Sequence, residues 1–171
     1  HRAVHLTRSQ PDSRVLLTTF SDTLANALKI KLRRLISNEP RIAERLEVIA
    51  IDEVGVRLYE LGFGKANIAS REEINDLINE YRRSVEDLKF SSRFLLSEWV
   101  DVVDAWQLQT WNDYRDVKRL GRKTRLAEPQ RKNLWSVFEY VKANLAKRGK
   151  ITTSEMFSLI ADKLSNRRSP P

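Results

Sequence analysis

The chain of 171 residues is 41% hydrophobic and 32% charged, a composition that can bury a core and that argues against wholesale disorder. It has no cysteine and no Gly-rich phosphate loop, which excludes disulfides, thiolate catalysis and nucleotide binding by such a loop. No apolar run approaches the length of a membrane span and the first twenty residues lack the apolar core of a signal peptide, so we expect a soluble chain without a membrane partner. The formal net charge of +8 is compatible with an acidic partner such as nucleic acid.

Residues 1–64 alternate between helix-like and strand-like patterns. The expected elements are a short helical piece through Leu6, a strand at 15–19, a helix from Ser21 or Asp22 to about 38, a strand at 46–51 and a helix ending at 62–64. The order strand, helix, strand, helix is typical of a parallel sheet. Because two strands do not make a stable open sheet alone, we expect this part to belong to a larger α/β domain.

After Gly64 the pattern is helical throughout. Capping signals and apolar spacing predict helices over 70–81, 94–104, 110–120, 129–147 and 152–164, followed by a frayed tail over 165–171. The sequence therefore predicts a mostly α fold with a small α/β part. Its expected domains are residues 1–64 and a helical unit over 65–164.

No catalytic constellation is visible in the sequence. His1 and His5 have a helical metal-ligand spacing, but no acidic residue lies between them, which favours a structural or solvent role. Two carboxylate pairs without flanking chemistry are predicted to lie on solvated helix faces: Asp101 with Asp104, and Glu72 with Glu73. We predict no catalytic residue and no metal site.

The positive charge is concentrated near the C-terminal end. Residues 1–40 carry a net +4, residues 41–114 a net −6 and residues 115–171 a net +10. Between 115 and 132 two acidic residues accompany eight basic ones: Arg115, Lys118, Arg119, Arg122, Lys123, Arg125, Arg131 and Lys132. This density favours phosphate contact, and the glycine-started turn 121–125 is the best single candidate.

Aromatic side chains flank the basic stretch: Trp106, Trp111, Tyr114, Trp135, Phe138 and Tyr140. Exposed rings there could stack on bases, as in nucleic-acid-binding proteins. Their spacing also matches buried helix faces, and this favours a place in the core of the helical unit for Trp111, Tyr114, Trp135 and Phe138.

Residues 15–28, Val-Leu-Leu-Thr-Thr-Phe-Ser-Asp-Thr-Leu-Ala-Asn-Ala-Leu, resemble motif Ia of the UvrD/Rep-like superfamily 1 DNA helicases. Residues 1–6 resemble the end of the helix after the Walker A loop of that family, and residues 48–58 lie where motif Ib is expected. The helical remainder resembles the inserted subdomain 1B at Glu98, Trp99, Tyr114, Arg119 to Arg122, Arg131 and Trp135. The resemblance implies a partial P-loop (RecA-like) motor domain that carries a helical insertion.

The resemblance implies DNA as the partner. Thr19, Phe20 and Ser21 match the motif Ia positions that line the single-stranded DNA path in the family. A strand end followed by a helix N-terminus presents N–H groups to phosphate, and a phenylalanine ring can stack on a base. Subdomain 1B of the family contacts duplex DNA, and the matching basic surface here comprises Arg119, Arg122, Lys123, Arg125 and Arg131.

The resemblance also implies that a longer parent protein is an ATP-dependent helicase, translocating 3′ to 5′ with ATP and Mg²⁺ as cofactors. The adenine-binding glutamine motif, Walker A, the Asp-Glu pair of motif II and the arginine fingers are absent from these residues. We therefore expect a segment trimmed at both ends, which binds no cofactor and is inactive alone. A cytoplasmic, nucleoid-associated bacterial protein is implied.

Another interpretation, from a different functional class, remains open. A stand-alone helical module could bind an acidic protein partner, or nucleic acid without motor activity, through its basic end. The acidic residues of 41–114 could also pair with that end in a dimer, and the sequence leaves the oligomeric state undetermined. A helicase–nuclease fusion or a defence-associated helicase is a third possibility for the parent.

Overall fold

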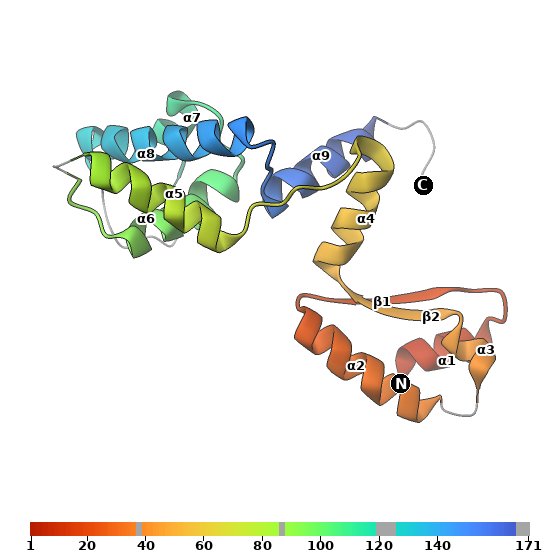
Figure 1. Ribbon diagram of the computed structural model, residues 1–171. Helices are drawn as coiled ribbons and strands as arrows, with labels where there is room; N and C mark the ends of the chain where they lie inside the picture. Colours follow the sequence, from red (N-terminus) through yellow and green to blue (C-terminus); the bar gives the residue numbers. More distant parts are fainter. Residues whose placement is uncertain (37–38, 86–87, 119–125, 167–171) are drawn as a thin grey trace. The chain divides into compact units, whose positions relative to one another are not determined.

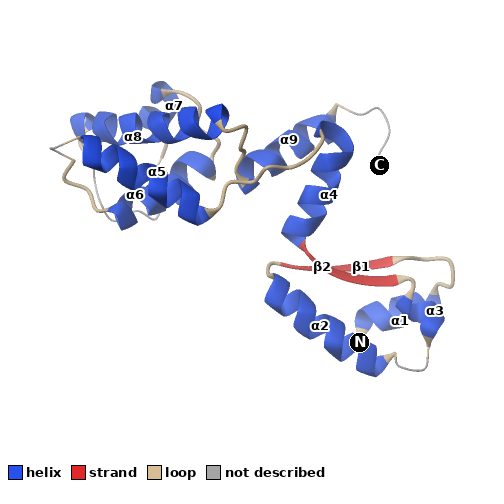
Figure 2. Cartoon of the chain, in the orientation of Figure 1, coloured by secondary structure: helices blue, strands red, loops and turns tan. Residues whose placement is uncertain are grey.

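The computed structural model describes residues 1–36, 39–85, 88–118 and 126–166. The chain divides into two compact units, residues 1–64 and residues 65–171. Helices predominate in both, and two strands pair in a small parallel sheet, as Figure 2 shows. The expected mostly α fold with a small α/β part is confirmed. Within the described ranges, no helix has the length and apolar character needed to cross a membrane.

The first unit is an α/β arrangement (Figure 1). Its elements are α1 (Arg2–Ser9), β1 (Val15–Thr19), α2 (Asp22–Leu35), α3 (Pro40–Ala43), β2 (Leu46–Ala50) and α4 (Ile51–Phe63). The strands run parallel, with Val15 opposite Leu46 and Thr19 opposite Ala50. The connection between them contains α2 and the short α3, which begins at Pro40 and which the sequence did not suggest.

The core of the first unit lies on one face of the sheet. Leu17 and Val48, which are paired in the parallel register, pack with a cluster contributed by the helices. Its other members are Val4, Ala25, Leu32, Ile36 and Ile42, with Leu28 and Leu46 at its margin. Leu16 is 49% exposed, because successive strand residues point to opposite faces. One face of this sheet is therefore packed and the other carries an exposed leucine.

A single arginine holds the turn between α1 and β1. Arg45 Nη1 donates to the carbonyl oxygens of Gln10, Pro11 and Ser13, and Nη2 donates to the carbonyl oxygen of Thr7. Its Nε donates to the carbonyl oxygen of Arg41. The guanidinium therefore satisfies carbonyl groups at the end of α1 and in the following turn from its position just before β2.

The second unit is helical (Figure 1). Its elements are α5 (Arg71–Ser84), α6 (Ser92–Glu98), the π-helical turn η1 (Trp99–Asp104), α7 (Trp111–Asp116), α8 (Glu128–Lys147) and α9 (Thr153–Ser165). An isolated parallel bridge also pairs Ile68 with Ile151. The predicted helices over 70–81 and 129–147 are confirmed. The final helix also begins as expected, after Thr152, and continues one residue beyond Leu164.

Two helix predictions need correction. The helix expected over 94–104 is α-helical only to Glu98 and then widens into the π-helical η1. The helix expected over 110–120 ends at Asp116, because Val117 has an extended backbone with ψ 133°. An α-helix and a π-helical turn place apolar residues at similar spacings, so the sequence pattern did not distinguish them over 99–104. Apolar spacing also did not show that the helix ends at Asp116.

Aromatic side chains form the centre of the second unit. Tyr114 and Phe138 are fully buried, with ring centroids 5.6 Å apart in an edge-on arrangement. Trp135 stacks on Tyr114 at 5.6 Å, and Trp99 lies 5.9 Å from Phe138. The predicted core position is confirmed for Tyr114, Trp135 and Phe138, while Trp111 packs half-buried at the edge of this cluster.

The variant Phe138→Ala tests this core. Removing a fully buried ring leaves a cavity, so we expect the free energy of unfolding of the second unit to fall by about 3–5 kcal/mol. All four tryptophans lie in residues 65–171, so tryptophan fluorescence during urea denaturation reports on this unit. Trp106→Ala, at a side chain that is 63% exposed, is the control and should change stability by about 0.5 kcal/mol or less. Equal losses in both variants would contradict the assignment of the core.

Candidate functional site

The end of β1 places Phe20 at the surface. β1 and β2 are parallel with Thr19 opposite Ala50, so α2 and α4 both begin at the same edge of the sheet. Thr19 is 9% exposed, whereas Phe20 is 93% exposed. Ser21 caps α2, because its Oγ accepts the N–H of Leu24 at 3.2 Å. Of the two candidate caps, Ser21 is confirmed.

The residues that follow both strands are acidic rather than basic. Asp22 begins α2, and Asp52 and Glu53 lie in the first turn of α4. Glu53 forms an ion pair of 2.7 Å with Arg57, which also contacts Glu47 at 2.7 Å and whose pKa is raised by these two carboxylates. Phosphate contact at this edge would therefore depend on backbone N–H groups, and Asp22 would oppose it.

Of the four basic residues of this stretch that the structure describes, the two arginines are bound within the protein. Arg115 binds the carboxylate of Asp116 through two hydrogen bonds of 2.8 Å. Arg131 is half-buried and its Nη1 donates to the carbonyl oxygen of Arg115, which ties the start of α8 to α7. Lys118 and Lys132 are exposed. Four predicted DNA-contacting residues lie outside the described residues: Arg119, Arg122, Lys123 and Arg125.

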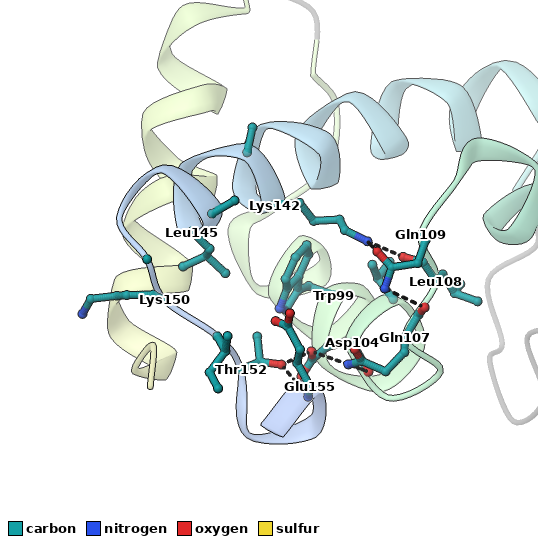
Figure 3. Close-up of a pocket in the computed structure, with 15 residues that line it drawn as sticks. Trp99, Asp104, Gln107, Leu108, Gln109, Lys142, Leu145, Lys150, Thr152 and Glu155 are labelled. Carbon is teal, nitrogen blue, oxygen red and sulfur yellow. Dashed lines mark hydrogen bonds between the residues drawn. The ribbon is translucent and has the colours of Figure 1, made fainter. Parts of the chain in front are cut away.

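The structure brings together a second group of residues that the sequence did not suggest as a site. A cavity of about 600 Å³ lies in the helical unit between η1, the end of α8 and the start of α9 (Figure 3). Asp104, expected on a solvated face, is half-buried in its wall and accepts hydrogen bonds from Gln107 Nε2 and Thr152 Oγ1. The i, i+3 spacing of Asp101 and Asp104 carried no sign of this, because Thr152 is distant in sequence.

Lys142 contributes a half-buried ammonium group to the wall of this cavity. Burial lowers its pKa, while the nearby carboxylates of Glu155, Asp113 and Asp104 raise it and oppose that shift. Its Nζ donates to the carbonyl oxygen of Leu108 at 2.6 Å and to Gln109 Oε1 at 2.7 Å. The lysine therefore fixes the segment that connects η1 to α7.

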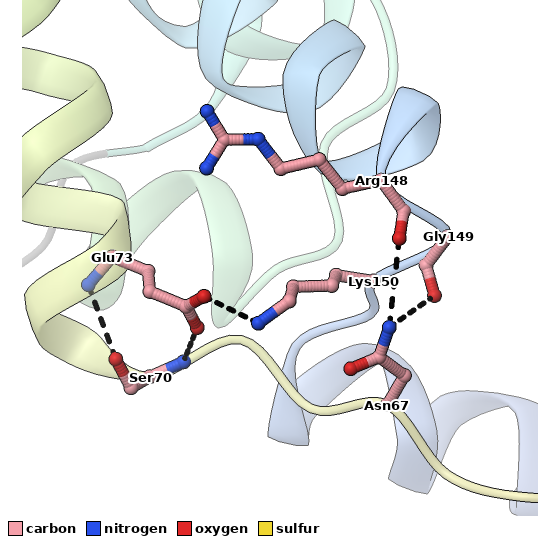
Figure 4. A network of polar contacts seen from close by, with 6 residues as sticks. All are labelled: Asn67, Ser70, Glu73, Arg148, Gly149 and Lys150. Atoms are coloured by element: carbon pink, nitrogen blue, oxygen red, sulfur yellow. Dashed lines mark hydrogen bonds and ion pairs between the residues drawn. The ribbon is translucent and has the colours of Figure 1, made fainter.

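A polar network beside this cavity joins residues 67–73, at the start of α5, to residues 148–150, after α8 (Figure 4). Ser70 and Glu73 form a reciprocal capping box at the start of α5, with bonds of 3.1 Å and 2.9 Å. Glu73 also accepts a hydrogen bond from Lys150, and Asn67 Nδ2 donates to the carbonyl oxygen of Gly149 at 3.2 Å. Glu73 is thus a paired carboxylate, not the solvated one that its sequence position suggested, while its neighbour Glu72 is exposed.

The pair formed by Glu73 and Lys150 predicts a pH dependence of stability. The hydrogen bond from Lys150, with help from the Ser70 N–H, lowers the pKa of Glu73 below its ordinary value of 4.5. A depressed folded-state pKa contributes stability above the unfolded pKa, and this contribution is lost as the pH falls through the folded-state pKa. The variant Glu73→Gln keeps an acceptor for Ser70 but loses the charge.

We therefore expect Glu73→Gln to be less stable than the wild type at about pH 6 and to approach it at about pH 3, in urea denaturation at a series of pH values. Glu72→Gln removes an exposed carboxylate from the same helical turn and serves as the control. A stability difference that is constant from pH 6 to 3, within about 0.3 kcal/mol, would show that the charge of Glu73 is not involved.

Comparisons of this chain with protein-family models, with curated proteins and with solved structures gave no significant match.

Proposed function

We propose that this chain is a DNA-contacting segment of a UvrD-like, ATP-dependent DNA helicase that translocates 3′ to 5′. The single observation that carries the proposal is the side chain of Phe20, which is 93% exposed at the end of β1 and the start of α2. A phenylalanine ring that is free of protein contacts can stack on a base, and an aromatic face accepts any base. The resemblance of residues 15–28 to motif Ia supports the same role.

In this proposal Phe20 stacks on a base of single-stranded DNA. The N–H groups at the start of α2 lie next to it and bind a phosphate, since a helix N-terminus carries a partial positive charge. Thr19 is largely buried and supports the backbone, and Ser21 uses its hydroxyl to cap the helix. Only Phe20 of these three therefore offers its side chain to the DNA.

Duplex contact is assigned to basic residues of 119–125, which lie outside the described residues. Arg119, Arg122, Lys123 and Arg125 carry this part of the proposal on their charge alone. Arg131 is given a positioning role instead, because its guanidinium is bound to the Arg115 carbonyl and its Nε is buried without an acceptor in the described ranges.

The cofactors ATP and Mg²⁺ are assigned to other parts of the parent protein. In the described residues, no group of three or more potential metal ligands gathers in one place, and the 171 residues contain no Gly-rich phosphate loop. The residues present therefore do not fit this cofactor, and we give them no step in ATP hydrolysis.

Phe20→Ala tests the stacking role. A base stacked on an aromatic ring contributes about 1–3 kcal/mol, so we expect affinity for oligo-dT to fall by about fivefold to a hundredfold. Fluorescence anisotropy with a labelled oligonucleotide measures this change, and the ring is so exposed that stability should be unaltered. Leu61→Ala, at an 84% exposed residue near the far end of α4, is the matched control. If the two variants bind DNA equally, Phe20 does not stack.

Asp22→Asn tests the phosphate contact. The carboxylate of Asp22 repels a phosphate at the start of α2, so its neutralisation should raise affinity for oligo-dT about two- to fivefold at low salt. Screening should remove the gain at about 0.5 M salt. Asp12→Asn, in the turn before β1, is the control, since it lies at the opposite end of the strand. An unchanged affinity in Asp22→Asn would place the phosphates elsewhere.

The interpretation as a module for an acidic protein partner is favoured by the separation of charge along the chain, net −6 over 41–114 and net +10 over 115–171. The double variant Arg122→Glu with Arg125→Glu distinguishes the two functions. Loss of DNA binding with unchanged sedimentation supports the helicase segment. Altered self-association with DNA binding intact supports the protein-binding module.

A further inference from the structure

The cavity of the helical unit has the dimensions and lining of a small-ligand site. Its volume is about 600 Å³, and much of its wall is apolar, with Val103, Leu145 and Ile151 among the contributors. Sites for small molecules are commonly cavities of about 300–1,000 Å³ with apolar walls and a few well-placed polar groups. All of the lining residues lie between Trp99 and Glu155, within one compact unit.

Irregular backbone surrounds this cavity. The π-helical η1 supplies Trp99, Val103 and Asp104 to its wall, and Gln107, just beyond η1, has a φ of 49° in the left-handed region. A π-helical turn and a left-handed non-glycine residue both cost free energy, and both occur preferentially at functional sites. Their presence at one cavity indicates that its shape is maintained at a cost to stability.

One donor in the wall has no acceptor. Trp99 is 2% exposed, and in the described part of the chain its Nε1 makes no hydrogen bond. The carboxylate of Glu155 points toward this nitrogen (Figure 3), yet no hydrogen bond joins the two groups. A buried N–H without an acceptor costs about 1–3 kcal/mol, so a ligand that supplies one gains that free energy on binding.

The Glu155 carboxylate can accept hydrogen bonds from a ligand, because it does not accept the N–H of the cap residue as a glutamate at this position of a capping box does. Thr152 caps α9 by accepting the Glu155 N–H at 3.1 Å, the first half of a capping box. In α5 the glutamate of such a box bonds back to the cap residue, as Glu73 does to the Ser70 N–H. For α9 no such return bond is formed among the described residues, and the Glu155 carboxylate lines the cavity instead.

The remaining polar groups of the wall are already paired. Asp104 accepts from Gln107 and Thr152, and Lys142 donates to Leu108 and Gln109. The ligand therefore meets one donor without an acceptor, the indole N–H, and the Glu155 carboxylate, which makes no hydrogen bond within the described ranges although the Lys142 ammonium lies near it. It must present an acceptor beside donors, on a body flat and apolar enough to fit between the walls.

We propose that the cavity binds guanine by its pairing edge, with O6 accepting from Trp99 Nε1 and with N1–H and the N2 amine donating to the Glu155 carboxylate. Among the common bases, guanine alone places two donors beside one acceptor on that edge. A carboxylate has two oxygens and accepts from both donors. The indole nitrogen is closed to solvent, so binding in this proposal requires the Glu155 side chain to rotate, after which both groups face the same edge of the base.

The guanine can come from a free nucleotide or from a base extruded from a DNA strand, which presents the same edge. Calorimetric titration of the 171-residue chain with guanosine, inosine and adenosine 5′-monophosphates separates base recognition from phosphate attraction, because the three share one phosphate. We expect guanosine monophosphate to bind at least ten times more tightly than the other two, since inosine lacks the N2 amine and adenosine lacks O6. Equal affinity for the three, or no binding at about 5 mM, would overturn the proposal.

The source is distinguished with oligo-dT that contains one central guanine or one central hypoxanthine. If the guanine oligonucleotide binds more tightly than the hypoxanthine one, and about as tightly as free guanosine monophosphate, the site accepts guanine from either source. If the guanine oligonucleotide binds more tightly than free guanosine monophosphate, which itself still binds more tightly than inosine monophosphate, the base comes from a strand. Because this site lies in the other unit from Phe20, the variant Phe20→Ala should retain guanosine monophosphate binding even if the proposed helicase function fails.

Two variants test the recognition itself. Trp99→Phe removes the indole N–H but keeps an aromatic ring against Phe138, and Glu155→Gln replaces one acceptor oxygen by a donor. Each should weaken guanosine monophosphate binding at least tenfold, and the Trp99 indole N–H resonance should shift on binding to the wild type. Glu72→Gln, the same change in the first turn of α5, is the control for charge and helix position. Unchanged affinity in either site variant, with the fold intact by circular dichroism, would refute the assigned contacts.

Discussion

The helical unit is organised around a hydrogen bond between two side chains that have no contact with solvent. Tyr114 donates its hydroxyl to Glu98 Oε1 at 3.0 Å, and both residues are 0% exposed. A carboxylate removed from water is tolerated only when hydrogen bonds compensate its lost hydration. The bond therefore sets the distance between the end of α6 and α7, and the surrounding rings of Trp135 and Phe138 have to pack around that fixed distance.

Glu98 is also the last α-helical residue before the chain widens into η1. The residues that follow Glu98 adopt π-helical geometry, which is uncommon and occurs frequently at functional sites. Trp99, the first residue of η1, packs on Phe138 and also lines the cavity. The polar bond in the core and the shape of the cavity are thus parts of one local arrangement.

Much of this fold could be predicted from sequence because the signals are local. Ser21 as a cap, the capping box of Ser70 with Glu73 and the apolar periodicity of α8 all depend on spacings of three or four residues. What the sequence did not reveal depends on partners far apart in the chain, such as Lys150 with Glu73 and Thr152 with Asp104. No local pattern specifies such pairs, so Asp104 and Glu73 were wrongly expected to be solvated.

At the candidate DNA contact, too, the sequence indicates the local structure but not the tertiary contacts. The sequence placed Phe20 and Ser21 at a junction of strand and helix, and the structure has them there. How much of each side chain reaches solvent depends on tertiary packing, and this separates the exposed Phe20 from the buried Thr19. The charge of Arg131 was visible in the sequence, but its hydrogen bond to the Arg115 carbonyl was not.

Arg45 has a consequence for how freely the surrounding sequence can vary. Its guanidinium binds the main-chain oxygens of Thr7, Gln10, Pro11 and Ser13, not their side chains. A turn recognised through its carbonyl groups keeps its conformation when its side chains are exchanged, provided that the backbone angles remain accessible. Residues 10–13 can therefore diverge while the fold is retained, whereas a lysine at position 45 could not reach the same carbonyl groups from a single ammonium. The conformation of this turn is therefore stabilised by a residue more than thirty positions away in the sequence.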